Sequence, residues 1–234
     1  MRIAVFSDIH GNQYAYEAFI EAIEPEALDQ IWFLGDWIGY YYGGCDILRD
    51  MRARGVRMIR GNHDQYLLDA LESGQDRLAA LAARYGQSYE IASTELSDAD
   101  IDFLRCVPAE IVEVTDGCRI RAVHGAPWDL LEGRAYPDVD RTKFAPWAAD
   151  YDFLFLGHTH HQMELDYGGL TVINPGSLGQ QRDGNRCSYL IFDTIARRFD
   201  RFSVVFDTAQ LIRDVKKWDP HQTGFIEVLT RKPL

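Results

Sequence analysis

Short polar motifs follow apolar, strand-like runs at five places along this chain of 234 residues. Chance would scatter histidines evenly, yet five of the seven fall inside these motifs. Carboxylate, imidazole and amide oxygen together suit divalent first-row metals. The chain is therefore constrained to a fold that brings distant strand ends together. The motifs are Asp8-Ile9-His10, Gly35-Asp36, Gly61-Asn62-His63-Asp64, His124 and Gly157-His158-Thr159-His160.

The order of elements in the first quarter of the chain predicts a parallel sheet. Apolar runs indicate strands at 3–7, 31–34 and 56–59, and helical spacing indicates helices at 12–22 and 46–54 between them. Such units favour parallel strands joined by right-handed crossovers. In open α/β sheets, ligands bind beyond the carboxyl ends of the strands. We therefore expect the first three motifs to meet at one edge of the sheet.

The rest of the chain completes one predicted domain, 1–234. Helical composition extends over 66–95 with a break near Gly74, and Ser97 opens a further helix with a capping box. A hairpin is expected around Asp116-Gly117, and its second arm leads into His124. A short run at 153–156 precedes His158. The segments between 163 and 206 are typical of an antiparallel meander.

Composition limits the location and the partners. No signal peptide is readable, and no apolar run reaches the length that a membrane span needs. We therefore expect a cytoplasmic location and no membrane partner. The four cysteines lack metal-site spacing. The formal net charge of −12 and the absence of a Lys/Arg-rich run argue against nucleic acid as a partner. An anionic substrate stays compatible, because bound cations would make the pocket locally positive. A homo-oligomer is left open.

The five motifs resemble the signature of the calcineurin-like metallophosphoesterase superfamily, DxH, GD, GNH[DE], H and GHxH. Segments 174–177 and 179–184 resemble its small YfcE-type phosphodiesterase branch. The resemblance implies an α/β fold, a four-layer α/β/β/α sandwich of two mixed β-sheets. It also implies a hydrolase, a phosphodiesterase or a phosphomonoesterase (phosphatase), that acts on a small or nucleotide phosphoester.

The resemblance further implies a dinuclear metal centre. One cation is expected on Asp8, His10 and His160, the second on Asn62, His124 and His158, and Asp36 bridges them. Mn²⁺ is the expected metal, with Fe, Zn or Ni as alternatives that the ligand set cannot separate. Two such cations hold a bridging hydroxide and clamp the phosphoryl oxygens. Along an extended segment, Asp8 and His10 would face the same side.

Three further residues are candidates for catalysis and substrate binding. In the resembling family, the position of His63 protonates the leaving oxygen or stabilises charge on the phosphoryl group. Asp64 orients that imidazole, caps the following helix, or does both. Arg182 contacts the substrate phosphate or the loop that carries Asp36, or it forms a loop salt bridge with Asp183.

Four aromatic residues in the segment 37–42 follow the bridging aspartate. Trp37 and Tyr40 are candidates for a wall that stacks on a nucleobase or aryl group. Alternatively, these rings pack the loop or form an oligomer contact. Trp128 and Tyr136, in the loop after His124, are candidates for the opposite wall.

Two other classes of function compete with hydrolysis of a small substrate. The same fold serves as a catalytically silent scaffold in a retromer subunit, but the complete ligand set argues against that reading. A nuclease is disfavoured by the acidic charge. The segment after Asp36 lacks the arginine of the protein Ser/Thr phosphatases, which disfavours phosphoprotein and symmetric dinucleoside tetraphosphate substrates.

Overall fold

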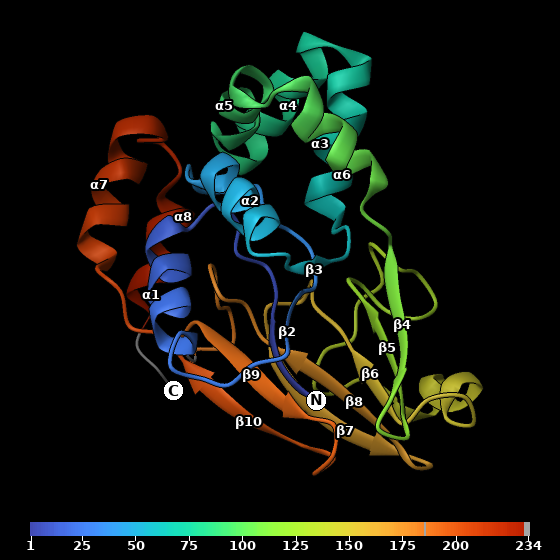
Figure 1. Cartoon of the computed structure of the whole chain (residues 1–234). Helices are drawn as coiled ribbons and strands as arrows, with labels where there is room; N and C mark the ends of the chain where they lie inside the picture. Colours follow the sequence, from blue (N-terminus) through green and yellow to red (C-terminus); the bar gives the residue numbers. More distant parts are fainter. Residues whose placement is uncertain (185, 232–234) are drawn as a thin grey trace.

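A computed structural model of the protein describes residues 1–184 and 186–231 (Figure 1). It contains two mixed five-stranded sheets. Sheet A has the strand order β10 (Arg198–Ser203), β9 (Ser188–Asp193), β1 (Arg2–Phe6), β2 (Gln30–Phe33) and β3 (Arg57–Met58). Sheet B has the order β4 (Glu110–Thr115), β5 (Cys118–Val123), β6 (Phe153–Phe155), β8 (Leu170–Pro175) and β7 (Gln162–Tyr167).

The parallel strands of both sheets deliver the polar motifs. β1, β2 and β3 run parallel, as predicted, with Ile3 opposite Gln30 and Trp32 opposite Arg57. In sheet B, β5 and β6 are also parallel, with Ile120 opposite Phe153. The five motifs follow the carboxyl ends of these five strands. The site is therefore assembled from both sheets rather than from one.

The two sheets share a buried core that fixes these strand ends. Fully buried side chains from each sheet pack into one cluster, among them Val5, Trp32, Ile120, Phe155 and Phe192. Truncating one such buried aromatic to alanine typically costs about 3–5 kcal/mol. Because protein interiors are close-packed, this core is a firm platform for the loops above it.

Helices cover the outer face of sheet A, and the predicted four layers are confirmed. In Figure 1 the helices α3 to α6 gather at the top, above the strands. The outer layer on sheet B is thin, because it consists of the 3₁₀ helix η1 (Arg141–Trp147) and its loop, whose Phe144 packs in one cluster with Leu154. The first six helices are α1 (Gln13–Ile23), α2 (Gly44–Ala53), α3 (Asn62–Ser73), α4 (Gln75–Tyr85), α5 (Ser88–Glu95) and α6 (Asp98–Cys106).

Local sequence signals were reliable at caps and turns. Asn12 accepts a hydrogen bond from the Ala15 amide at the start of α1, and Ser97 with Asp100 forms the predicted capping box. The hairpin turn at Asp116-Gly117 has φ of 48° and 73°, as a type I′ turn requires. The predicted helix at 66–95 is broken not only at Gly74 but also at Gly86, where φ is +87°.

The predicted meander at 163–206 is correct for its two antiparallel strand pairs but wrong in joining them in one sheet. β7 and β8 pair in sheet B, whereas β9 and β10 pair in sheet A, where β9 lies against β1. The hydrophobic pattern of each strand was readable, but the switch between sheets depends on tertiary packing. Two C-terminal helices, α7 (Thr208–Trp218) and α8 (Thr223–Thr230), were not predicted. Tyr14 of α1 donates a hydrogen bond to Asp214 of α7.

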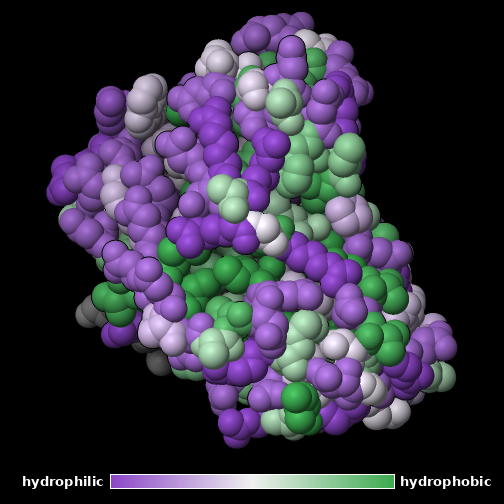
Figure 2. Space-filling model, in the orientation of Figure 1, coloured by the Kyte–Doolittle hydropathy of each residue, from purple (hydrophilic) through white to green (hydrophobic). Residues whose placement is uncertain are grey.

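The surface agrees with the acidic, polar composition. Figure 2 shows the helices at the top of the molecule mainly as hydrophilic residues, with hydrophobic residues gathered below them over the strands. Within the described part of the chain, no helix combines the length and the apolar character that crossing a membrane would need.

Candidate metal centre

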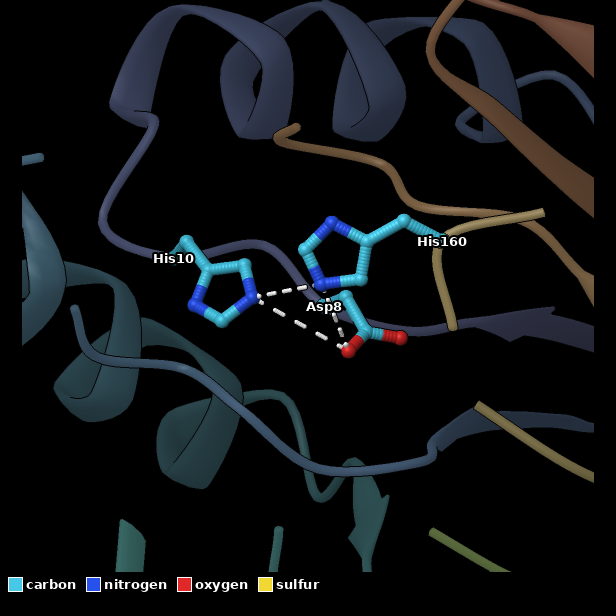
Figure 3. A group of neighbouring side chains, drawn as sticks. All are labelled: Asp8, His10 and His160. Atoms are coloured by element: carbon cyan, nitrogen blue, oxygen red, sulfur yellow. Dashed lines mark hydrogen bonds and ion pairs between the residues drawn. The ribbon is translucent and has the colours of Figure 1, made fainter. Parts of the chain in front are cut away.

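The first group of converging side chains joins the motifs of residues 8–10 and 157–160. Asp8, His10 and His160 are all buried. Their nitrogen and oxygen atoms point at one another (Figure 3). His10 Nε2 and His160 Nε2 are 2.9 Å apart, and Asp8 Oδ1 lies 3.2 Å from His160 Nε2 and 3.9 Å from His10 Nε2. Residues separated by 150 positions in the sequence thus enclose one small volume.

The second group joins the remaining motifs. His124 Nε2 lies 3.0 Å from Asn62 Oδ1, and His158 Nδ1 lies 2.9 Å from the same oxygen. Asp36 Oδ2 is 3.3 Å from His124 Nε2 and 3.8 Å from His10 Nε2. One carboxylate oxygen therefore stands between the two groups. The structure brings together all seven residues that the sequence predicted as metal ligands.

Backbone conformation aims these side chains, and it corrects one expectation. Asp8 and His10 do not lie on an extended segment, because their φ values are 55° and 49°. Asp36, His158 and His160 are also in the left-handed region, at φ of 66°, 65° and 58°. Non-glycine residues rarely adopt this region, and each instance costs on the order of 1 kcal/mol. The convergence of the ligands thus depends on strained turns after the strands rather than on strand pleating.

Glycines in the motifs allow the close approach. A Cβ atom on Gly61 would lie 2.1 Å from Asp36 Oδ1, and one on Gly157 would lie 2.2 Å from Ser7 Oγ. Both distances are far below van der Waals contact, so any side chain there would displace neighbouring site residues. The glycines that precede Asn62 and His158 in the sequence are therefore part of the site geometry.

Backbone carbonyls fix the tautomers of three histidines. Nδ1 of His10, His124 and His160 faces the carbonyl oxygen of Ile38, Leu34 and Gln180, at 2.8, 2.7 and 2.6 Å. A carbonyl oxygen can only accept, so each Nδ1 carries a hydrogen. In the neutral rings, Nε2 is then a lone pair directed into the site, which is the arrangement found in metal-binding histidines.

The donor set fits a cation. In the neutral rings, two lone pairs face each other across 2.9 Å at His10 and His160, which is repulsive unless a positive charge lies nearby. Asp8 Oδ1 is buried and has no hydrogen-bond partner among the described residues. A buried unpaired carboxylate oxygen is costly. A divalent cation would relieve both conditions.

Opposite charges perturb the ionisation of the site strongly. Burial opposes ionisation of Asp8, but His160 outweighs it and lowers the pKa of Asp8 to about 2. Burial likewise opposes ionisation of Asp36, but His124 holds the pKa of Asp36 well below its usual range. Burial lowers the pKa of His124, yet the Asp36 carboxylate outweighs it and raises that pKa to about 10. The Asp36 carboxylate therefore favours a proton on His124, which is itself a proposed metal ligand.

This proton leads to a testable prediction about metal uptake. The pKa of His124 is raised from 6.5 to about 10, so near neutral pH the ring must lose its proton before it can bind a metal. Metal binding is expected to release this proton, and the apparent affinity should rise by about tenfold per pH unit up to the raised pKa. Calorimetric titration in buffers of different ionisation enthalpy measures the release. A binding enthalpy that is the same in every buffer would contradict the prediction.

The structure separates the two roles considered for Asp64. Its carboxylate accepts hydrogen bonds from the backbone amides of Gly61, Asp36 and Trp37. It thus caps α3 and ties the Asp36 loop to it. No hydrogen bond between Asp64 and His63 is found in the described residues. The orienting role expected for Asp64 is therefore wrong, because its oxygens are turned toward backbone amides.

His63 has a different partner, which sequence reasoning missed. Its Nδ1 lies 2.7 Å from the hydroxyl oxygen of Tyr89, the second residue of α5. Burial lowers the pKa of His63 to about 4. Tyr89 lies in a segment that reads only as an ordinary helix, so nothing local to the sequence marks it as a site residue.

The aromatic residues of the segment 37–42 and of the loop after His124 have different surroundings. Trp37 is 1% exposed and belongs to the core beside sheet A, so the prediction that it stacks on substrate is wrong. Tyr40 does reach the site, with its ring edge-on to His10 at 4.8 Å. Trp128 and Tyr136 are exposed, but Trp128 contacts Phe144 of η1. Stacking on substrate stays a candidate role for Tyr40, Trp128 and Tyr136, but not for Trp37.

Two arginines stand at the rim of the site. Arg182 donates to the Tyr40 hydroxyl at 2.9 Å, so it contacts the loop that carries Asp36, one of its predicted roles. Nε of Arg134 lies 3.3 Å from Nε2 of His158, and Arg134 was not predicted. It forms no ion pair with the residues that the structure describes, in a chain of net charge −12. The only sequence signal was its place in the loop after His124.

Comparison with known proteins identifies the family. A profile of the calcineurin-like phosphoesterase superfamily domain matches residues 1–197. The chain therefore belongs to the calcineurin-like phosphoesterase superfamily, as its motifs predicted.

Proteins of similar sequence match different fractions of this chain. An uncharacterized protein of Methanocaldococcus jannaschii is 28% identical over 236 residues, 92% of each chain. A symmetrical bis(5'-nucleosyl)-tetraphosphatase of Erwinia tasmaniensis is 29% identical over 58% of this chain, which spans 49% of that relative. The name of that relative refers to the dinucleoside tetraphosphate class, which the sequence of this chain had disfavoured.

Solved structures share the fold. A metallophosphoesterase from Sphaerobacter thermophilus superposes with a TM-score of 0.77 at 26% identity, over 99% of each chain. The YfcE phosphoesterase of E. coli superposes with a TM-score of 0.52 at 19% identity, over 88% of this chain and 100% of that one. At that identity the second likeness concerns the fold alone.

Proposed function

We propose that this protein is a hydrolase that cleaves a small or nucleotide phosphoester with two divalent cations. The observation that carries the proposal is the position of Asp36, whose Oδ2 lies 3.3 Å from His124 Nε2 and 3.8 Å from His10 Nε2. A carboxylate can bind two cations at once, whereas an imidazole presents a single lone pair. The bridging position of a dinuclear centre therefore needs such a residue.

The ligands divide naturally between two cations. Asp8, His10 and His160 would hold one, and Asn62, His124 and His158 would hold the other. When bound, such a pair supplies Lewis acidity and a hydroxide nucleophile at neutral pH. Mn²⁺ is the proposed metal, with Fe, Zn or Ni as alternatives, because these borderline cations accept the same nitrogen and oxygen ligands.

The chain's own residues bind and polarise the substrate. Arg134 and Arg182 approach the site from the loop after His124 and the loop after β8, so an anionic phosphoryl group would lie between guanidinium groups that match its oxygens. His63 lies among the ligands and would donate a hydrogen bond to the phosphoryl or leaving oxygen. His63 and the proposed ligands other than the half-buried His158 are buried, which limits the access of competing water.

Replacing Arg134 with alanine is expected to raise KM about tenfold with a smaller effect on kcat, because a charge-assisted hydrogen bond is worth about 1.5–3 kcal/mol. Arg134→Lys should recover part of the loss. Arg141→Ala, at an exposed position near the same loop, serves as the control. Steady-state kinetics on one phosphoester measure all three variants, and an unchanged KM for Arg134→Ala would exclude the binding role.

Hydrolysis itself is tested on a panel of substrates with metal-depleted protein and Mn²⁺. The panel contains an aryl phosphodiester, an aryl phosphomonoester, a cyclic nucleotide and a symmetric dinucleoside tetraphosphate. We expect low turnover of the aryl diester that depends on added metal. Absence of turnover for every class, with both metal positions shown to be loaded, would overturn the proposal.

A partner-binding assay and a single-stranded DNA assay, added to this panel, separate the competing functions. A scaffold protein would bind a partner tightly and hydrolyse nothing with metal present. A nuclease would degrade single-stranded DNA at low salt, where phosphate-driven binding is strongest. The intact ligand cluster and the net charge of −12 favour hydrolysis of a small phosphoester over both.

A further inference from the structure

His63 stands among four tyrosine side chains, and one of them touches its ring nitrogen. The rings of Tyr40, Tyr66 and Tyr85 lie 5.3, 5.6 and 4.6 Å from the His63 ring, by their centroids. Only Tyr89 contacts the ring through its hydroxyl, at 2.7 Å from Nδ1. The contact is fully enclosed, since Tyr89 is 0% exposed and His63 is 6% exposed.

The direction of this hydrogen bond follows from the surroundings. Within the described chain, the Tyr89 hydroxyl has no other hydrogen-bond partner. If Nδ1 carried the ring hydrogen, the hydroxyl hydrogen of Tyr89 would be buried without an acceptor, at a cost of about 1–3 kcal/mol. A spare lone pair on the hydroxyl oxygen is cheaper. The hydroxyl is therefore the donor and Nδ1 the acceptor.

The other nitrogen of His63 then carries the hydrogen. An Nδ1 that accepts the hydroxyl hydrogen of Tyr89 carries no hydrogen of its own, so the ring is neutral. A neutral imidazole with Nδ1 as an acceptor has its hydrogen on Nε2. One ring nitrogen of His63 lies within 4.8 Å of potential ligand atoms of His10 and Asp36, which places the imidazole beside the proposed metal ligands.

Further contacts fix the loop and the helices around His63. The amide of Tyr40 donates to the carbonyl oxygen of Tyr85 at 2.8 Å, which ties the end of α4 to the loop that carries Asp36. A Cβ on Gly39 would lie 2.5 Å from His63 Nδ1, so the backbone of the same loop closes the other side of the ring. The imidazole is held between this loop and α5.

We propose that Tyr89 is a positioning residue for His63, whose hydroxyl donates to Nδ1 and so keeps the ring hydrogen on Nε2, available to the phosphoester. The inference rests on the proposed hydrolase function and deepens it, because it makes His63 a neutral hydrogen-bond donor to developing charge. It assigns to a tyrosine of α5 the orienting task that sequence reasoning gave to Asp64.

A double-mutant cycle tests whether Tyr89 acts through His63. Tyr89→Phe removes only the hydroxyl. We expect kcat to fall by about tenfold, while KM changes by less than about twofold. This loss in kcat is smaller than the roughly 100- to 1,000-fold loss that follows removal of a charge-stabilising donor itself. In a His63→Ala background the same change should alter kcat by less than about twofold, because coupled residues are not additive. An equal loss in both backgrounds, or no loss in the wild-type background, would overturn the proposal.

A matched control and a spectroscopic measurement complete the test. Tyr41→Phe also removes a buried hydroxyl from the same region, where it donates to the Phe225 carbonyl, and should leave kcat unchanged. Ring ¹⁵N spectra of the Zn²⁺-loaded protein should show hydrogen on Nε2 of His63, and a mixture of tautomers in Tyr89→Phe. Hydrogen on Nδ1 in the wild type would refute the inference, and this measurement stands even if no substrate is hydrolysed.

Discussion

Asp36→Asn should abolish hydrolysis while leaving the fold intact. Asparagine has nearly the same shape, but it removes the negative charge of the carboxylate whose Oδ2 stands between the two ligand groups. We expect kcat/KM to fall by at least about a thousandfold, the upper end of what a single charge-stabilising group contributes. The bound metal, measured by elemental analysis, should fall below two ions per chain.

The control for this variant is Asp46→Asn, whose side chain is 89% exposed. Its activity and metal content should match those of the wild type. If Asp36→Asn bound two ions and retained activity, the dinuclear arrangement would be wrong, even though the family assignment would stand.

His63→Ala is expected to separate metal binding from catalysis. His63 lies beside the ligand Asn62 but is not itself a proposed ligand, so the variant should bind as much metal as the wild type. We expect kcat to fall more than about a hundredfold, because a positioned donor or acid typically contributes 100- to 10,000-fold. Metal content and steady-state kinetics, measured on the same preparation, give both quantities.

His161→Ala is the matched histidine control. His161 directly follows the ligand His160, and its Nδ1 faces the carbonyl oxygen of Thr159. Its removal should leave turnover unchanged. Normal turnover in His63→Ala would remove His63 from the mechanism, and with it the role proposed for Tyr89.

Much of the candidate site was predictable because its proposed ligands lie at strand ends. Asp8, Asp36 and Asn62 each follow a short apolar run, and parallel strands bring their carboxyl ends to one edge. The residues around the ligands were not predictable in this way. Arg134 and Tyr89 reach the site from a loop and a helix whose placement depends on tertiary packing.

The same limit explains the errors in the fold. The segments that became β9 and β10 carry the right strand pattern, but a pattern does not say which of two sheets a strand joins. Trp37 follows a ligand in sequence, yet its ring is buried because the turn at Asp36 directs it into the core. Asp64 was assigned to its neighbour His63, although adjacent residues in the first turn of a helix point in different directions.

At five of the proposed ligands, the left-handed backbone conformation that directs the side chain into the site also lowers the stability of the folded protein. Glycine in place of Asp8, His10 or Asp36 would relieve backbone strain on the order of 1 kcal/mol at each position. Such substitutions could raise the melting temperature while they remove the proposed metal ligands and the activity. Selection or engineering for heat tolerance alone would therefore tend to erode these five positions first, and a screen for improved variants needs an activity readout beside the melting temperature.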